Sequence, residues 1–393
     1  MKARSLGQNL PRAKQMNRSL VLEQMLFHGP MNRQTIAQNL GLTSATITNF
    51  TGKLIREGLV HEVGYVEEER LGRRSVTIDL RNDLYVVMAI HLRATDLEIG
   101  FVGLRGAVSK RRLISYPKGL TKLTFLQFIK DHIRTQFALR ESLDVVAIGV
   151  GSRALPLRVT DDQVVVSTDH HLHTIGLKQE ISQYVDVPVF LQSNAPGMAM
   201  AERMYGHCRH IENFLLIYMG PKGIGSGLIL HGELCKGTGI STLGFGHMLY
   251  QDGGRPCLCG RKGCLELYAS ESAILEACQL SSIKALSEKV KSGDEGAQRV
   301  LEQSAHAMAS VLLSFLSMVD LHRVILGGTL ASPAYPLVST LQTHLQKNAG
   351  ILDDGSVEVS VSALGSDLGI VGAAAPAIFE YIIRGSELPE IRG

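Results

Sequence analysis

The sequence predicts an α/β protein in which a small N-terminal domain of helices and two strands precedes a larger body of two α/β lobes. Two observations lead to this fold class. Three helical patterns and two alternating apolar–polar segments fill the first eighty residues, and the rest of the chain mixes strands and helices in two similar blocks. At 393 residues the chain is long enough for two or three domains, and we place a boundary between residues 1–82 and 83–393.

Three helical patterns follow one another closely at the N-terminus. Each has apolar residues at helical spacing, and glycine separates one pattern from the next, as at Gly41. Asn32 is suited to cap the second helix, and Thr43 or Ser44 the third. A short helix, a glycine turn and a second helix that begins with hydroxyl side chains are typical of a helix-turn-helix. The three expected helices are 17–27, 32–40 and 43–57.

The third helix carries hydroxyl, amide and basic side chains on the face opposite its apolar stripe. Such groups read base edges and hold phosphates when a recognition helix enters the major groove. Residues 1–80 hold eleven Lys and Arg against seven Asp and Glu, a basic balance typical of a nucleic-acid module. A solvated face on a small helical bundle is the alternative. The candidate DNA contacts are Arg33, Thr43, Ser44, Thr46, Thr48, Asn49 and Lys53.

Two alternating segments, 59–66 and 75–80, predict a pair of strands after the third helix. The stretch between them ends in a Gly-Arg-Arg tip, as a β-wing would. Arginines on such a wing enter a minor groove or hold phosphate. The candidates here are Arg70, Arg73 and Arg74. Residues 67–69 are glutamates, which we place on the solvent side of the wing.

Apolar runs and helical spacing predict the elements of the body in chain order. Three strands come first and a helix follows them, and the strands and helices together fall into two similar blocks. The expected strands are 85–92, 96–104, 108–115, 145–150, 164–167, 187–191, 214–219, 227–230, 324–326 and 357–362. The expected helices are 123–139, 177–184, 194–205, most of 270–318, and 369–383.

One imidazole and three thiols, His247, Cys257, Cys259 and Cys264, fall within a short glycine-rich loop. Four nitrogen and sulfur ligands suit a closed tetrahedral zinc site, and a closed site has no position for a reacting water. We therefore expect structural Zn²⁺, with ordinary buried cysteines as the alternative. The histidines at 170, 171 and 173 have no further ligand at a useful spacing and predict a solvated loop.

The loop is similar to the zinc signature of the ROK family, which comprises repressors, open reading frames and sugar kinases. The matching residues run from Gly246-His247 through Cys257-Leu-Cys259-Gly-Arg-Lys-Gly263-Cys264-Leu-Glu266. The resemblance covers essentially the whole chain. It implies an actin-like, hexokinase-like body with a cleft between a small lobe, 83–195 plus the C-terminal helix, and a large lobe, 196–377, that carries the zinc loop. It also implies a winged helix-turn-helix, which ROK repressors carry and ROK kinases lack.

The resemblance further implies that catalytic residues have been lost. The kinases carry an Asp-x-Gly-Gly-Thr phosphate loop, of which this chain keeps only Thr95. Asn194 stands where they have the catalytic Asp, and an amide cannot accept the sugar's proton. We expect no enzymatic activity. By the same resemblance Asn194, His247 and Glu266 are candidates to bind a ligand, whereas Gly244 replaces a sugar-binding Glu.

Together these features predict a sequence-specific transcriptional regulator, a repressor of genes for sugar uptake or metabolism. We expect a homodimer or homotetramer on a palindromic operator in double-stranded DNA, with a sugar or sugar phosphate as effector. A sugar kinase with an added DNA-binding domain and a regulator controlled by a protein partner are the alternatives. Few cysteines and no apolar signal segment favour the cytoplasm, and no run of 18 apolar residues predicts a membrane span.

Overall fold

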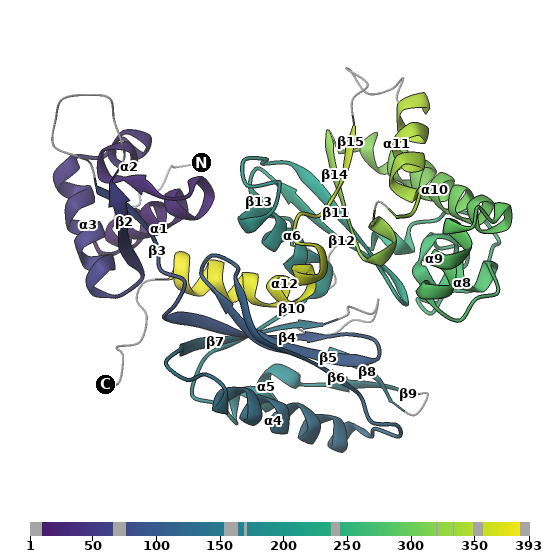
Figure 1. Ribbon diagram of the computed structural model, residues 1–393, viewed down its shortest axis with the longest axis horizontal. Coiled ribbons are helices and arrows are strands. Elements are labelled where there is room, and N and C mark those ends of the chain that lie inside the picture. Colours follow the sequence, from purple (N-terminus) through teal and green to yellow (C-terminus); the bar gives the residue numbers. More distant parts are fainter. Residues whose placement is uncertain are drawn as a thin grey trace, which may run out of the picture.

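The computed structural model describes residues 10–65, 76–152, 164–168, 171–236, 244–319, 321–332, 334–348 and 357–385. Its N-terminal unit consists of three helices packed against a small antiparallel sheet in the order β1-β3-β2 (Figure 1). The predicted wing tip, with Arg70, Arg73 and Arg74, lies outside the described residues. The elements of this unit are α1 (Leu10–His28), β1 (Met31–Asn32), α2 (Arg33–Leu40), α3 (Ser44–Arg56), β2 (Val60–Tyr65) and β3 (Val76–Leu80).

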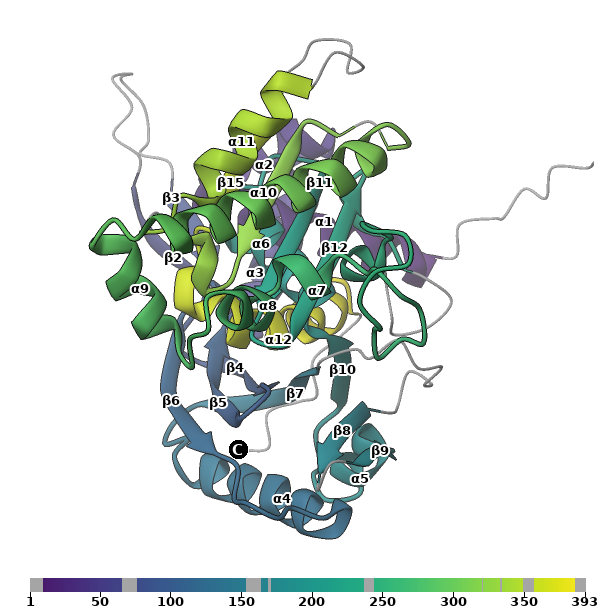
Figure 2. The same cartoon turned by 90° about the vertical axis from the view of Figure 1, so that its right-hand side faces the viewer.

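The first sheet of the body has the strand order β10-β7-β4-β5-β6. In chain order, β4, β5 and β6 form an antiparallel meander. Strands β7 and β10 then run parallel to β4. Every residue of β4 is buried, which matches its uninterrupted apolar run. Helices α4 and α5 cover one face of this sheet (Figure 2). The elements are β4 (Tyr85–Leu92), β5 (Asp96–Gly103), β6 (Val108–Ser115), α4 (Lys122–Ala138), β7 (Asp144–Ser152), α5 (Leu177–Ser182) and β10 (Val189–Ser193).

The second sheet repeats this arrangement with the order β13-β12-β11-β14-β15. In chain order, β11, β12 and β13 form an antiparallel meander. Strands β14 and β15 then run parallel to β11. A group of helices packs on its outer side. The elements are β11 (Phe214–Gly220), β12 (Gly223–Leu230), β13 (Glu233–Leu234), α7 (Glu266–Ala269), α8 (Glu271–Ala277), α9 (Ile283–Lys291), α10 (Glu295–Leu316), β14 (Arg323–Gly327), α11 (Leu337–Asn348) and β15 (Glu358–Val361).

Two helices, α6 (Asn194–Tyr205) and α12 (Leu368–Pro376), lie between the two sheets (Figure 1). The two helices lie close to each other and to the first sheet because glycines stand at the contacts. A side chain at Gly197 of α6 would collide with the carbonyl group of Gly372 on α12, and a side chain at Gly149 of β7 would collide with that of Ala373. A π-helical segment, Ala377–Ile383, continues α12. The stretch 365–383 is long and apolar enough to cross a membrane, but 72% of it is buried within the protein, as in a core helix.

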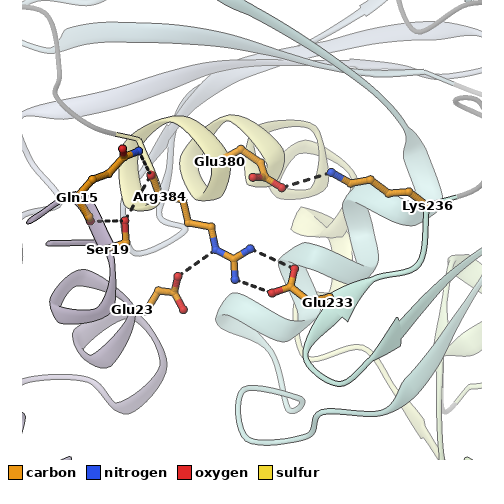
Figure 3. Close-up of polar contacts among 7 residues, drawn as sticks. All are labelled: Gln15, Ser19, Glu23, Glu233, Lys236, Glu380 and Arg384. Carbon is orange, nitrogen blue, oxygen red and sulfur yellow. Dashed lines mark hydrogen bonds and ion pairs between the residues drawn. The ribbon is translucent and has the colours of Figure 1, made fainter. Parts of the chain in front are cut away.

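The N-terminal unit shares one hydrophobic core with the end of this C-terminal helix. Val21, Leu22 and Met25 of α1 belong to the same buried cluster as Ile378 and Ile382. Polar contacts reinforce the junction (Figure 3). The Arg384 guanidinium binds the carboxylate of Glu23 on α1 at 3.0 Å and that of Glu233 on β13 at 2.6 Å. The C-terminal segment therefore joins the N-terminal helices to the second sheet.

Some elements differ from the expectations. Helix α1 begins at Leu10, earlier than expected, because its first turns contain no apolar stripe that a pattern could reveal. The expected helical region 270–318 contains three separate helices, α8, α9 and α10. His171 and His173 belong to a strand, β9 (His171–Ile175), which pairs with β8 (Val164–Thr168), so the expectation of a loop there was wrong.

A candidate metal centre and ligand cleft

The loop that carries the three cysteines is a narrow, irregular hairpin. Isolated bridges join Leu249 to Cys264 and Pro256 to Lys262, which brings its two arms together. Gly263 has a φ of 73°, in the left-handed region, and a side chain there would collide with the carbonyl oxygen of Gln251. Glycine is thus required at the position immediately before Cys264, and it directs this thiol inward.

His247 and the three cysteines converge, as the sequence predicts. Their ligand atoms all lie within 4.8 Å of one another. The sulfur of Cys257 is 3.5 Å from Nδ1 of His247, and the sulfurs of Cys259 and Cys264 are 3.5 Å apart without a disulfide bond. Cys257 and Cys264 are buried. One imidazole and three thiols at this spacing can hold a metal ion, and the donor set is one that zinc favours in a closed tetrahedral site.

The two thiols nearest the loop tip differ in their tendency to ionise. Burial raises the pKa of Cys257 to about 12. Burial also opposes ionisation of Cys259, but hydrogen bonds from the backbone and side chain of Arg261 outweigh it and lower the pKa of Cys259 to about 7. Without metal, therefore, Cys259 supplies the first thiolate. Metal binding must displace the remaining thiol protons, which makes affinity rise with pH.

A cleft lies beside this loop, between the two sheets. It encloses about 930 Å³ of space, part of which is open to solvent. The turns at the ends of β4, β10 and β11 form its walls, as is usual at the carboxyl ends of strands. Among its lining residues are Arg93, Asn194, Lys222, Gly244, His247 and Glu266. The structure thus brings all three predicted ligand-binding residues to one cleft.

Asn194 is the first residue of α6, at the floor of the cleft. Its amide nitrogen is 3.5 Å from the carbonyl oxygen of Leu92, a weak contact. Its Oδ1 is buried and has no hydrogen-bond partner. Since an unsatisfied buried acceptor is destabilising, this oxygen favours the arrival of a donor such as a ligand hydroxyl. Glu266 is placed differently: its carboxylate lies 3.3 Å from His247 Nδ1 and 3.2 Å from the Cys257 sulfur.

Strands β4 and β5 hold a buried polar cluster that sequence reasoning missed. His91 Nδ1 lies 2.9 Å from a carboxylate oxygen of Glu98, and Arg111 approaches the other oxygen at 2.5 Å. Burial alone would raise the pKa of Glu98, but the hydrogen bond from His91 and the nearby arginines lower it. The sequence contained a signal for this contact, because His91 and Glu98 stand opposite each other when the two predicted strands pair as an antiparallel hairpin.

In the N-terminal unit, α2 and α3 meet at a tight turn. Asn32 caps α2, Gly41 ends it with a φ of 62°, and the Thr43 side chain accepts a hydrogen bond from the Thr46 backbone at the start of α3. Ile47 of α3 is buried. Ser44, Thr48, Asn49 and Lys53 are exposed on its other face, as predicted from the pattern.

Five of the candidate DNA contacts already have internal partners. Along α3, the Thr48 hydroxyl donates to the Ser44 carbonyl oxygen at 2.8 Å, and Lys53 lies 3.5 Å from the Glu57 carboxylate. Thr43 and Thr46 bond to each other through their hydroxyls at 2.8 Å. The Arg33 guanidinium is 3.0 Å from the Thr51 hydroxyl and 3.1 Å from the Glu62 carboxylate. These side chains therefore stabilise the turn and the adjoining sheet.

Residues 87–379 match the model of the ROK family. The chain belongs to this family. It is 24% identical over 377 residues to the xylose repressor of Bacillus subtilis (strain 168), covering 94% of this chain and 96% of that protein. It is 23% identical over 367 residues to the DNA-binding transcriptional dual regulator NagC of Escherichia coli (strain K12), covering 87% of each. Similar curated proteins are thus named as regulators of transcription.

Two solved structures show how far the fold likeness extends. A ROK family transcriptional regulator, a homologue of the E. coli MLC protein, is similar with a TM-score of 0.75 and 24% identity, covering 95% of this chain and 97% of that one. A ROK family glucokinase from Streptomyces griseus, in complex with glucose and AMPPNP, has a TM-score of 0.61 and 23% identity and covers 74% of this chain and 98% of that one. The body is therefore a mixed α/β ROK body with hexokinase-like neighbours. The body alone is too short to give the 95% coverage of the match to the regulator, so that match extends into the N-terminal unit.

Proposed function

We propose that this protein is a sequence-specific transcriptional repressor of genes for sugar uptake or metabolism. Residues 1–82 form its winged helix-turn-helix, and residues 83–393 form a ligand-sensing body, with a small lobe of 83–195 plus the C-terminal helix and a large lobe of 196–377. The observation that carries the proposal is α3. Its apolar face is buried in the N-terminal unit, whereas Ser44, Thr48, Asn49 and Lys53 are exposed along the other face, ready to meet DNA.

The proposed docking places α3 in the major groove. Asn49 reads a base edge, hydroxyls of Ser44 and Thr48 hold phosphates near the helix start, and Lys53 reaches a phosphate further along. Arg70, Arg73 and Arg74 of the wing bind the adjacent minor groove or backbone. A homodimer or homotetramer in the cytoplasm grips two half-sites of a palindromic operator, about one helical turn or a multiple of it apart.

In the body we propose that Zn²⁺ occupies the cluster of His247, Cys257, Cys259 and Cys264 as a structural ion. It stiffens the wall of the cleft, into which Glu266 projects beside His247. A sugar or sugar phosphate in the cleft favours one arrangement of the lobes, in proportion to its difference in affinity for the two states. Control by a protein partner is the alternative. Because an amide at Asn194 cannot act as a general base, the cleft senses its ligand without turning it over.

The proposal is tested by capturing genomic DNA fragments with the purified full chain and sequencing them. We expect discrete palindromic sites. Replacement of Asn49 by alanine should weaken binding to such a site by 1–3 kcal/mol, roughly, and relax specificity at one position. Replacement of Gln298, an exposed amide on α10, by alanine is the matched control and should change nothing. Capture of random fragments, or of none, would contradict the proposal, and ATP turnover with a sugar would favour the kinase alternative.

A further inference from the structure

Helices α10 and α11 pack against each other in the second half of the body (Figure 1). Their facing sides are apolar, and Ala305 of α10 and Leu345 of α11 belong to the same buried cluster. Each helix has a histidine at the edge of this contact, because His306 follows Ala305 and His344 precedes Leu345. The packing of the two helices therefore brings two imidazoles together at the surface.

The rings of His306 and His344 lie edge to face. Their centroids are 5.2 Å apart, and the angle between their planes is 69°. Two imidazoles that bind one tetrahedral zinc ion at about 2.0 to 2.1 Å have ring centres roughly 5 Å apart, so the spacing suits a shared ion. Within the described part of the chain neither ring has a hydrogen-bond partner, since Ser310 and Asn348 donate to the backbone carbonyl oxygens of these two residues instead. Each neutral ring can therefore offer a nitrogen lone pair.

A second pair of histidines has the same spacing but a different geometry. His28, at the end of α1, and His210, after α6, also have ring centroids 5.2 Å apart, but the angle between their planes is only 21°. A metal ion lies in the plane of each imidazole that binds it. Nearly parallel, stacked rings cannot direct both lone pairs at one ion, so the spacing alone does not make a metal site. The pair of His28 and His210 is thus a natural control for the pair on α10 and α11.

Glu302 can complete the pair on α10 and α11. It stands four residues before His306 and so lies on the same face of α10, and with both histidines it lines an open hollow. Its side chain is exposed and makes no ion pair with another described residue, so it is able to turn toward the imidazoles. Arg299 lines the hollow as well, but its guanidinium is 3.6 Å from the carboxylate of Glu295. The hollow therefore offers two nitrogen ligands and one carboxylate.

We propose that His306, His344 and Glu302 form a second metal site, separate from the cysteine loop, that takes a divalent transition-metal ion such as Zn²⁺. Imidazole ligands favour such ions, whereas Mg²⁺ and Ca²⁺ prefer oxygen. Three protein ligands leave at least one position to water, so this ion exchanges more readily than one enclosed by four ligands. Because the two histidines belong to different helices, the bound ion fastens α11 to α10. Free zinc thereby adjusts the stability of the large lobe.

Calorimetric titration of the full chain, without an affinity tag, with Zn²⁺ tests the proposal. We expect one ion per chain at this site, with a Kd in about the micromolar range. His306→Gln and His344→Gln should each weaken this binding by about tenfold or more, since each removes one ligand. Glu302→Gln should weaken it less, because an amide oxygen can still bind the ion. His210→Gln is the matched control and should leave the titration unchanged. Ions that enter the cysteine loop persist in every variant, so the difference from the wild type isolates the new site.

Thermal unfolding gives a second readout, because an ion that binds only the folded state raises Tm. Zn²⁺ should raise Tm by more in the wild type and in His210→Gln than in the two variants on α10 and α11, and Mg²⁺ at the same concentration should not reproduce this difference. Circular dichroism before metal is added checks that the variants are folded. Zn²⁺ binding that is the same in the wild type and in both variants would overturn the proposal. An equal loss in His210→Gln, or one ion shared by two chains, would overturn it as well.

Discussion

The two halves of the body use the same meander for different purposes. In each half, one hairpin turn faces the cleft and the next turn, at the other end of the strands, faces the N-terminal unit. At the cleft, the first half has the turn after β4, which carries Arg93, whereas the second half has a shorter turn that carries Lys222 between Gly220 and Gly223. Both turns bring a cation to the cleft, but only the turn of the second half is flanked by glycines, so its backbone can approach an anion more closely.

The opposite turns differ as well. In the first half, Arg105 follows β5 and donates to the carbonyl oxygens of Met25 and Leu26 at the end of α1, at 2.8 and 3.3 Å, and also pairs with Asp79. In the second half, Glu233, at the corresponding turn, reaches α1 through Arg384. The turn of the first half thus binds the N-terminal unit directly, whereas the turn of the second half binds it through an intermediary. The two halves thus share the direction of each turn but differ in the contacts that the turn makes.

The largest expected effect concerns the metal loop, which is inserted only in the second half. Cys264→Ser removes one of the four proposed ligands, which is buried, and zinc binding contributes about 10 to 16 kcal/mol to folding in zinc-finger peptides. We expect loss of zinc, measured by elemental analysis, and a drop in Tm of roughly 10 °C or more. Cys278→Ser, at a half-buried thiol outside the cluster, is the control. A zinc-free variant with unchanged Tm would show that the insertion does not stabilise its half.

The second effect concerns the buried pair of the first half. Glu98→Ala leaves His91 and Arg111 without their shared carboxylate and should lower the free energy of unfolding by about 3 to 5 kcal/mol, measured by urea titration. Because the pKa of Glu98 is lowered from 4.5, the pair stabilises the fold above that pH, and its contribution is lost as pH falls below it. In the variant this part of the acid sensitivity should be absent. An unchanged acid transition would count against the assignment.

The third effect concerns the hydrogen bonds that the first half donates directly to α1. Arg105→Ala removes charged hydrogen bonds to two carbonyl groups and leaves Asp79 unpaired, at an expected loss of about 2 to 3 kcal/mol. Burial lowers the pKa of Arg105 to about 10, which is still far above neutral pH, so the guanidinium keeps its proton when it donates to α1. Hydrogen exchange of α1 amides is the measurement. Protection equal to that of the wild type would contradict the role.

The smallest effect concerns the indirect link of the second half. Glu233→Gln removes an ion pair whose carboxylate is 59% exposed, so stability should change by less than about 1 kcal/mol. If the two halves grip the N-terminal unit unequally, as the contacts indicate, this variant should leave the α1 amides almost as protected as in the wild type. A loss of protection as large as that in Arg105→Ala would show that the two links are equivalent.

Local patterns predicted the local parts of this structure well. Asn32, Gly41 and Thr43 act as the caps and turn that their residue types suggest. The four candidate metal ligands lie near one another in sequence, so their convergence follows from a tight loop alone. One helix, α11, was missed although Leu337 and Leu341, both buried, stand at helical spacing; short helices with weak flanking signals are easily overlooked.

Contacts between distant segments could not be derived in the same way. The bond from Arg105 to Met25 spans 80 residues, and its formation depends on how the N-terminal unit sits against the body. Arg93 and Lys222 face one cleft only because the two meanders meet around α6 and α12. Composition and periodicity describe which face of an element is buried, but they do not specify which other element buries it.

The contacts between α1 and the C-terminal segment also determine when, during synthesis, the N-terminal helices can complete their packing. Arg18 on α1, almost fully buried, donates to the carbonyl oxygens of Ile382 and Gly385, and Ser19 bonds to that of Arg384. Ile382 lies 364 residues after Arg18, which a ribosome needs about 20 to 70 s to traverse. Throughout that interval the apolar stripe of α1 lacks the part of its native cover that the C-terminal segment supplies. The N-terminal helices, although synthesised first, are therefore among the last parts of the molecule to reach their final packing.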